Sequence, residues 1–155
     1  MTQRTINFTV GGIPATAGSK RAMPIYRGKK GSKQFTGKTV VIPANSKKQY
    51  QWQSDCKMVA RQAMTGDPMT GPVKIMLEFR FTRPKSHFGA GKNSEIRKPT
   101  APVDHITKPD LDKLVRAVCD SLKGVIWRDD SQVIWIKAYK RYDILSGADV
   151  SIQEL

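Results

Sequence analysis

The stretch KPDLDKLVRAVCDSLKGVIWRDDSQV, residues 108–133, decides the fold of this chain. Residues 109–123 predict an amphipathic helix, because apolar side chains recur there at the i, i+3, i+4 and i+7 spacing: Leu111, Leu114, Val115, Val118, Cys119 and Leu122. Gly124 predicts the end of that helix, and residues 125–127 predict a short strand. A turn at residues 128–131 then leads into a long alternating strand over residues 132–142.

Outside this stretch, the hydrophobic pattern predicts three more strands and one more helix. The strands are expected over residues 4–10, 73–81 and 150–155, and the helix over residues 46–64. Strands and helices mixed in this order predict an α+β fold. We therefore expect one small domain over residues 1–155, with a mixed β-sheet and two main helices.

Two pairs of aspartates flank the helix of residues 109–123. Asp110 and Asp112 stand at its start, and Asp129 and Asp130 stand in the turn after it. Each pair alone has an ordinary explanation, because aspartate is favoured at helix N-termini and in turns. Helix and strand can return both pairs to one end of the fold, where they would offer three or four carboxylates to hard cations. In a chain with 13 acidic residues against 27 Lys and Arg, this clustering indicates a Mg²⁺ site for phosphodiester hydrolysis.

The formal net charge of +14 favours a polyanionic partner, above all nucleic acid. Residues 20–38 carry seven basic residues and no acid, and predict a flexible arm or a β-ribbon. Residues 83–107 predict a second basic segment, a long loop rich in Pro and Gly. Charge runs are usually solvated surface, but the lack of acids in residues 20–38 and the extreme net charge favour contact with the DNA backbone. The expected DNA-binding side chains are Lys20, Arg21, Arg27, Lys29, Lys30, Lys33, Lys85, Lys92, Lys108 and Lys113.

Nothing in the sequence points to secretion or to a membrane. The first ten residues lack the pattern of a signal peptide, and no apolar run reaches the roughly 18 residues of a membrane span. Cys56 and Cys119 show no zinc-binding spacing and are expected to be reduced thiols. We expect a cytoplasmic protein.

The quoted stretch resembles the signature region of the RusA-type Holliday-junction resolvases. The residues that carry this resemblance are Lys108, Pro109, Asp110, Leu111, Asp112, Leu114, Asp120, Leu122, Gly124, Asp129, Asp130 and Gln132. The resemblance implies a small α+β homodimer that binds four-way DNA junctions and cuts two opposed strands with Mg²⁺, or with Mn²⁺ in its place. It also implies that Asp110, Asp112 and Asp130 are the essential metal-binding carboxylates, with Asp129 as a turn former.

Two positions depart from the family pattern. Lys113 stands where the family usually has Asn, and Arg116 stands where a functional Lys is common. Arg116 keeps the charge and can grip a phosphate through two N–H groups, but it cannot donate a proton as Lys can. Its ordinary explanation is an i,i+4 ion pair with Asp112.

A few other side chains near this region have more than one interpretation. Phe88 either inserts into the opened centre of a junction or packs its loop onto the body, and the second is favoured. His105 is expected to be an exposed loop histidine. Trp127 and Trp135 are expected to pack the strands that position the acidic turn.

The leading hypothesis is a Mg²⁺-dependent, structure-selective endonuclease that resolves Holliday junctions. Its catalytic region spans residues 108–142, in which Asp110, Asp112, Asp130 and Arg116 would act. The alternatives are a non-catalytic basic protein that binds DNA junctions and a less selective metal-dependent nuclease.

Overall fold

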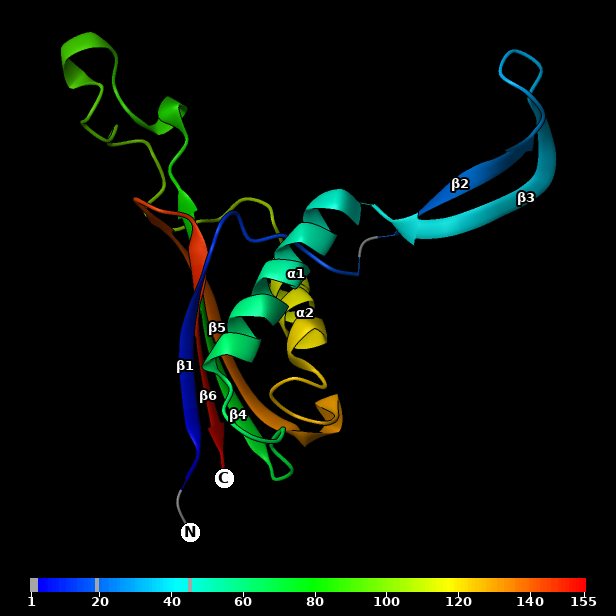
Figure 1. The fold of residues 1–155 in the computed structure, drawn as a ribbon. Coiled ribbons are helices and arrows are strands. Elements are labelled where there is room, and N and C mark those ends of the chain that lie inside the picture. Colours follow the sequence, from blue (N-terminus) through cyan, green and yellow to red (C-terminus); the bar gives the residue numbers. More distant parts are fainter. Residues whose placement is uncertain (1–2, 19, 45) are drawn as a thin grey trace.

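The chain forms one four-stranded sheet that carries both α-helices on the same face (Figure 1). The computed structural model describes residues 3–18, 20–44 and 46–155. The sheet has the order β1-β6-β4-β5, made of β1 (Thr5–Gly11), β6 (Gly147–Glu154), β4 (Val73–Thr82) and β5 (Val133–Asp143). β4 and β5 run parallel, whereas the other neighbours run antiparallel. The predicted α+β class with a mixed sheet is confirmed.

The core lies between the sheet and its two helices, α1 (Ser46–Ala63) and α2 (Leu111–Leu122). Alternate side chains of β4 are buried on the helix side, as the pattern in the sequence predicts: Val73, Ile75, Leu77, Phe79 and Phe81. α2 buries Leu114, Val118 and Leu122 against them. Both helices are therefore fixed to the sheet by hydrophobic burial, and α2 presents its other face to solvent.

β5 is an edge strand, and this overturns the expectation for Trp135. In the described chain β5 pairs only with β4. Trp135 lies opposite Lys74, on the face that the helices do not cover, and remains 45% exposed. Trp127 is fully buried, as predicted.

Residues 125–127 do not form the short strand that their apolar character suggests. Gly124 has a φ of +75°, and its N–H bonds back to the carbonyl of Trp127 at 2.7 Å. The N–H groups of Val125 and Ile126 both bond to the carbonyl of Leu122. Hydrogen bonds this local make a buried turn, so the apolar side chains fill the core without joining a sheet.

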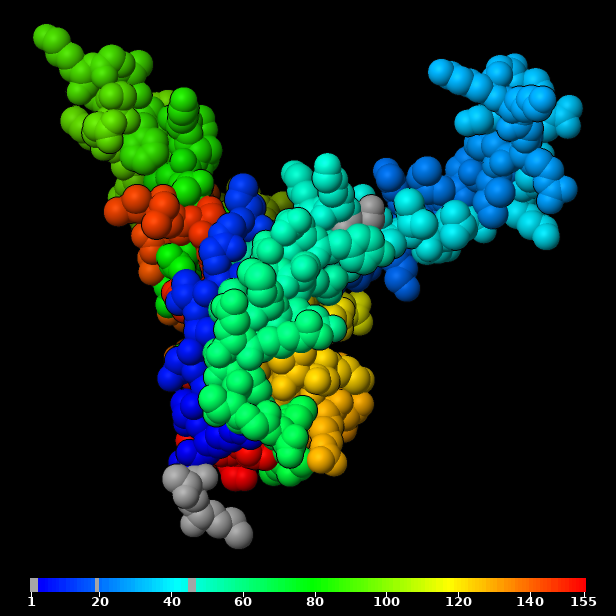
Figure 2. Space-filling model, in the orientation of Figure 1, coloured from blue at the N-terminus to red at the C-terminus, as the bar shows by residue number. Residues whose placement is uncertain are grey.

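Two basic segments project from the same end of the body and diverge from each other (Figures 1 and 2). The first, the hairpin arm, comprises residues 20–43 and pairs β2 (Lys20–Arg27) with β3 (Gln34–Pro43) in a separate antiparallel sheet. Of the two interpretations of residues 20–38, the β-ribbon is the correct one. The second, the loop arm, comprises residues 83–107 and contains two short 3-10 helices, Lys85–His87 and Gly91–Asn93. Neither α-helix of the described residues has the length and apolarity that a membrane crossing requires.

The base of the loop arm is held by stacked rings, which makes the expectation for His105 wrong. His105 is only 7% exposed, and its ring centroid lies 4.5 Å from that of Phe81 and 4.8 Å from that of Tyr142. The guanidinium of Arg83 lies over the same Tyr142 ring, 4.1 Å from its centroid, and donates to the carbonyls of Pro102 and Val103. The ends of β4 and β5 thus bury a histidine that the sequence places in a polar loop.

Candidate active site

A groove between α2 and β5 contains two of the three aspartates predicted to hold metal, Asp112 and Asp130. It is lined by Asp112, Arg116, Asp120 and Asp130 together with the apolar side chains of Val115, Cys119, Val133 and Ile136. Asp112, Arg116 and Asp120 follow one another at i, i+4 and i+8, so they share one exposed face of α2. The polar half of this amphipathic helix therefore forms one wall of the groove.

Asp130 reaches the groove from the turn that precedes β5. It opens a short 3-10 helix, Asp130–Gln132, and its Oδ1 accepts a hydrogen bond from the buried indole Nε1 of Trp127 at 3.0 Å. Lys123 at the end of α2 lies 3.8 Å from its Oδ2. Trp127 thus orients one carboxylate oxygen and leaves the other beside the ammonium group of Lys123.

Asp129 performs the structural role in this turn. Its carboxylate accepts from the N–H of Ser131 at 3.0 Å and pairs with Lys123 at 2.9 Å. The backbone N–H, followed by the lysine, lowers the pKa of Asp129 to about 2. The geometry agrees with the expectation that Asp129 is a turn former.

Gln132 fixes the turn that carries Asp129 and Asp130 to the segment just before β4. Its side-chain oxygen accepts from the N–H groups of Arg128 and Asp129, both at 2.9 Å. Its side-chain nitrogen donates to the carbonyls of Met69 and Gly71, both at 3.0 Å. One side chain therefore joins the turn that carries Asp130 to the segment that leads into β4.

Asp110 lies outside the lining of the groove. It occupies the N-cap position of α2, but its side chain makes no capping hydrogen bond. It pairs instead with Lys113 at 2.8 Å, and this bond to the lysine holds the pKa of Asp110 below its usual range. Lys140 fixes the backbone just before it by donating to the carbonyls of Thr107 and Pro109.

The donor atoms in the groove suit a hard divalent cation, although the described residues contain no ready-made cluster of three or more metal-binding side chains. Asp120 is the acid of the groove that reasoning from the sequence left out of the site, although its i+8 spacing from Asp112 indicated a shared face. Burial, and then the charge of Asp130, raise the pKa of Asp120 above its usual range. A cation between these carboxylates would relieve that repulsion.

Cys119 lines the groove but is not a reactive thiol. Burial, and then the charges of Asp130 and Asp120, raise its pKa to about 12. Cys56 is fully buried in the core, and both cysteines are free, as predicted.

Arg116 is in contact with the root of the hairpin arm. The N–H of Ala17 donates to the carbonyl of Lys113 at 3.0 Å, so the segment before β2 lies on α2. A Cβ on Gly18 would stand 2.7 Å from Nη1 of Arg116. The side chain predicted to hold a phosphate is thus packed against the base of a cationic arm.

The basic residues expected to bind DNA do not form one patch. Those of the hairpin arm are exposed along β2 and at the tip of the hairpin: Arg21, Arg27, Lys29, Lys30 and Lys33, with Lys20 at the root. Lys85 and Lys92 are exposed on the loop arm, and Lys108 and Lys113 stand at the start of α2. Phe88 is half-buried within the loop arm, in a bridge with Arg97, and packing of the loop onto the body by this side chain stays a prediction.

Comparison with known proteins agrees with this geometry. Residues 23–153 match the family described as endodeoxyribonuclease RusA, a range that covers the groove, the loop arm and most of the hairpin arm. The chain is also similar to the uncharacterized protein YqaN of Bacillus subtilis strain 168. The two are 34% identical over 157 residues, which span 97% of this chain and 96% of that protein.

Proposed function

Because the chain belongs to the family of the endodeoxyribonuclease RusA, we propose that it is a Mg²⁺-dependent, structure-selective endonuclease that resolves Holliday junctions by paired cuts. The observation that carries this proposal is the groove in which Asp112 and Asp130 lie together with Arg116. Three carboxylates concentrated in one groove of a chain with net charge +14 suit a cation that bridges protein and phosphate.

Asp112, Asp130 and Asp110 would hold the metal, and Asp120 stands where it can complete the set. A bound Mg²⁺, or Mn²⁺ in its place, would supply a nucleophilic water and neutralise charge on the scissile phosphate. Asp110 would have to exchange Lys113 for the cation, and an exposed ion pair of this kind is weak enough to exchange.

The remaining residues would position the DNA. Arg116 can take a phosphate oxygen through two parallel N–H groups, and its fixed positive charge serves binding and not proton transfer. With Asp110 among the metal ligands, Lys113 would be free to contact a phosphate. The two diverging arms would each contact the backbone of a separate DNA branch, which adds affinity with little dependence on sequence.

A homodimer would be built by pairing the free edges of two β5 strands. This edge exposes Ile134, Trp135 and Ile136 at 61%, 45% and 45% of their surface. An exposed apolar segment of an edge strand favours association unless it is covered. A two-fold axis across it would place one groove on each side of a substrate that has the same symmetry, which paired incision requires.

The test is cleavage of a synthetic four-way junction and of a matched linear duplex, each with Mg²⁺ or with EDTA. We expect the protein to cut the junction only with Mg²⁺. Asp112→Asn and Asp130→Asn should slow cutting by about 100-fold or more, because an amide cannot neutralise the metal, while junction binding persists. Asp67→Asn, an acid outside the groove, is the matched control and should cut normally.

Two outcomes would favour the alternative functions. Binding without any cutting in Mg²⁺ or Mn²⁺ would identify a non-catalytic junction-binding protein. Equal cutting of junction and linear duplex would identify a less selective nuclease.

A further inference from the structure

The hairpin arm exposes aromatic side chains that fold stability does not explain. Every residue of β2 and most of β3 are exposed, and the arm stands away from the body (Figures 1 and 2). Close to the tip of the hairpin Tyr26 lies opposite Phe35, and each remains 54% exposed. Large aromatic surface on a projecting arm usually marks a contact with another molecule.

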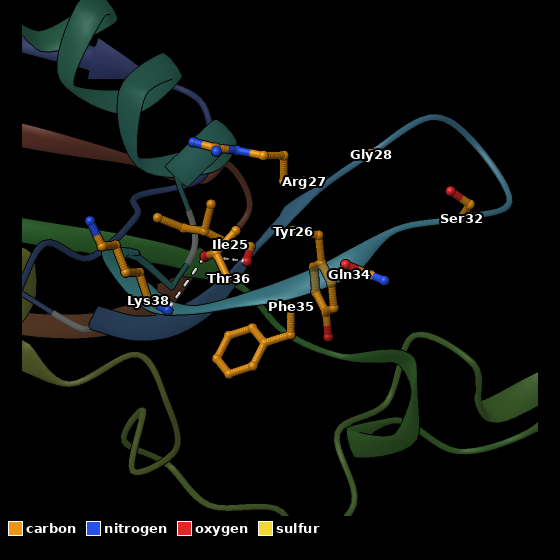
Figure 3. A pocket seen from close by; sticks show the side chains of 9 residues that line it. All are labelled: Ile25, Tyr26, Arg27, Gly28, Ser32, Gln34, Phe35, Thr36 and Lys38. Atoms are coloured by element: carbon orange, nitrogen blue, oxygen red, sulfur yellow. Dashed lines mark hydrogen bonds between the residues drawn. The ribbon is translucent and has the colours of Figure 1, made fainter.

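Tyr26 and Phe35 act as a pair. A register shift between Pro24 and Tyr26 brings the two residues opposite each other across the ribbon. Their ring centroids are 5.9 Å apart and the planes are tilted by 56°. Figure 3 shows both side chains projecting from the same face of the hairpin, whereas Arg27 projects from the other. Their open ring surfaces therefore form one platform.

The surroundings of this platform are cationic. Tyr26, Phe35, Arg27 and Lys38 line one open hollow of about 790 Å³ (Figure 3). Lys29, Lys30 and Lys33 follow at the tip, and residues 1–54 contain no acidic side chain. A ligand that satisfies this site needs flat faces for the rings and negative charges for the cations.

We propose that Tyr26 and Phe35 form a stacking platform for unpaired DNA bases, with Lys38 and the lysines of the hairpin tip holding the phosphates of the same strand. Bases inside a duplex are already stacked on their neighbours, whereas bases at the centre of a branched DNA can be unstacked. Aromatic stacking beside a cationic track is how proteins bind single strands without reading sequence. This proposal rests on the proposed function, which supplies branched DNA as the substrate. It adds that the hairpin arm prefers DNA with unstacked bases over intact duplex.

Binding, without cleavage, is the direct test. The Asp112→Asn protein would be titrated with a twelve-residue thymidine oligonucleotide, with a linear duplex, and with a four-way junction that carries 2-aminopurine at its centre. In that background Tyr26→Ala/Phe35→Ala should weaken oligonucleotide binding about tenfold or more and leave duplex binding within about twofold. The 2-aminopurine signal should change on binding to the parent protein and not to this variant.

Three further variants separate stacking from hairpin folding. Phe35→Leu keeps an apolar side chain but no aromatic face, and should lose the fluorescence change, whereas Phe35→Tyr should retain it. Val41→Ala removes an apolar side chain of β3 that is 61% exposed and should behave as the parent. Equal weakening of single-stranded and duplex binding, or unchanged binding in Phe35→Leu, would overturn the proposal.

Other occupants of the platform give distinct results. If Tyr26→Ala/Phe35→Ala abolishes binding to anionic phosphatidylglycerol vesicles but leaves oligonucleotide binding intact, the aromatic pair contacts a membrane surface. If this variant has a lower mass than the parent protein in light scattering but still binds the oligonucleotide, the aromatic pair forms a contact between copies of the chain. If the wild-type protein never cuts junctions but the binding results are as expected, the stacking proposal is supported and the nuclease proposal fails.

Discussion

At the scale of a single residue, Gly18 controls the space available to Arg116. Its φ of +95° suits glycine, and a Cβ there would lie 2.7 Å from the guanidinium nitrogen Nη1. We expect Gly18→Ala to displace the Arg116 side chain and to slow junction cleavage roughly tenfold, because small displacements of positioning groups are costly in catalysis. Single-turnover cleavage with saturating protein measures this.

Gly12→Ala is the matched control for this prediction. Gly12 has nearly the same φ, +100°, but a Cβ added there meets no atom within 4 Å. Both variants should therefore lose similar stability, about 1 kcal/mol, from backbone strain alone. If they also cut DNA at the same rate, Gly18 does not position Arg116.

At the scale of elements, Gln132 joins the turn that carries Asp130 to the segment before β4. Gln132→Glu keeps the oxygen that accepts from residues 128 and 129 but loses the N–H groups that donate to Met69 and Gly71. We expect it to lower the free energy of unfolding by about 1–3 kcal/mol, because two carbonyls lose their partner and face a carboxylate. Freed from this contact, the turn should hold Asp130 less well, and cleavage should slow as well. Thermal unfolding and cleavage below the melting transition measure the two effects.

Glu154→Gln is the control for a general loss of stability, because Glu154 holds the same segment from the end of β6. Its Oε1 accepts from the N–H groups of Thr70 and Gly71, both at 2.8 Å, and these bonds keep the pKa of Glu154 below its ordinary 4.5. The stabilisation is thus present above pH 4.5 and lost as pH falls through the lowered pKa, where the melting temperatures of wild type and variant should converge. Near neutral pH Glu154→Gln should be less stable but cut normally. Equal slowing in both variants would show that Gln132 only stabilises the fold.

At the scale of the whole molecule, the free edge of β5 is the proposed interface of the homodimer. Ile134 is 61% exposed on this edge and lies outside the lining of the groove. We expect Ile134→Lys to convert a dimer into a monomer, because paired edges would bury the two added charges together. Light scattering measures the mass. Because a monomer would cut one strand at a time, a supercoiled plasmid with an extruded cruciform should yield nicked circles in place of linear DNA.

Ile13→Lys, at a position that is 75% exposed beyond β1, is the control and should remain dimeric. A dimer that survives Ile134→Lys would exclude the β5 edge as its interface. A monomeric wild type, with and without junction DNA, would exclude the dimer.

The sequence predicts those parts of the molecule that depend on local periodicity. The helix of residues 109–123 and the strand of residues 73–81 are found with small shifts of their ends, because burial of one face dictates their spacing. The outer position of β5 could not be predicted, since strand order is set by long-range pairing, and Trp135 was misplaced for that reason. The place of Asp120 beside Asp130 could not be predicted either, because it arises only when β5 pairs with β4. The position of Tyr26 opposite Phe35 could not be predicted because it depends on a register shift in the hairpin.

The pairing of β1 with β6 has a practical consequence. Thr5 lies opposite Gln153, so the start of β1 and the end of β6 lie side by side at the end of the sheet away from the two arms (Figure 1). A short linker could join them into a closed backbone, and new ends opened between Gly28 and Ser32 would interrupt no core element. In such a circular permutant the platform would be carried by two separate tails, and its contribution could be removed by trimming either one.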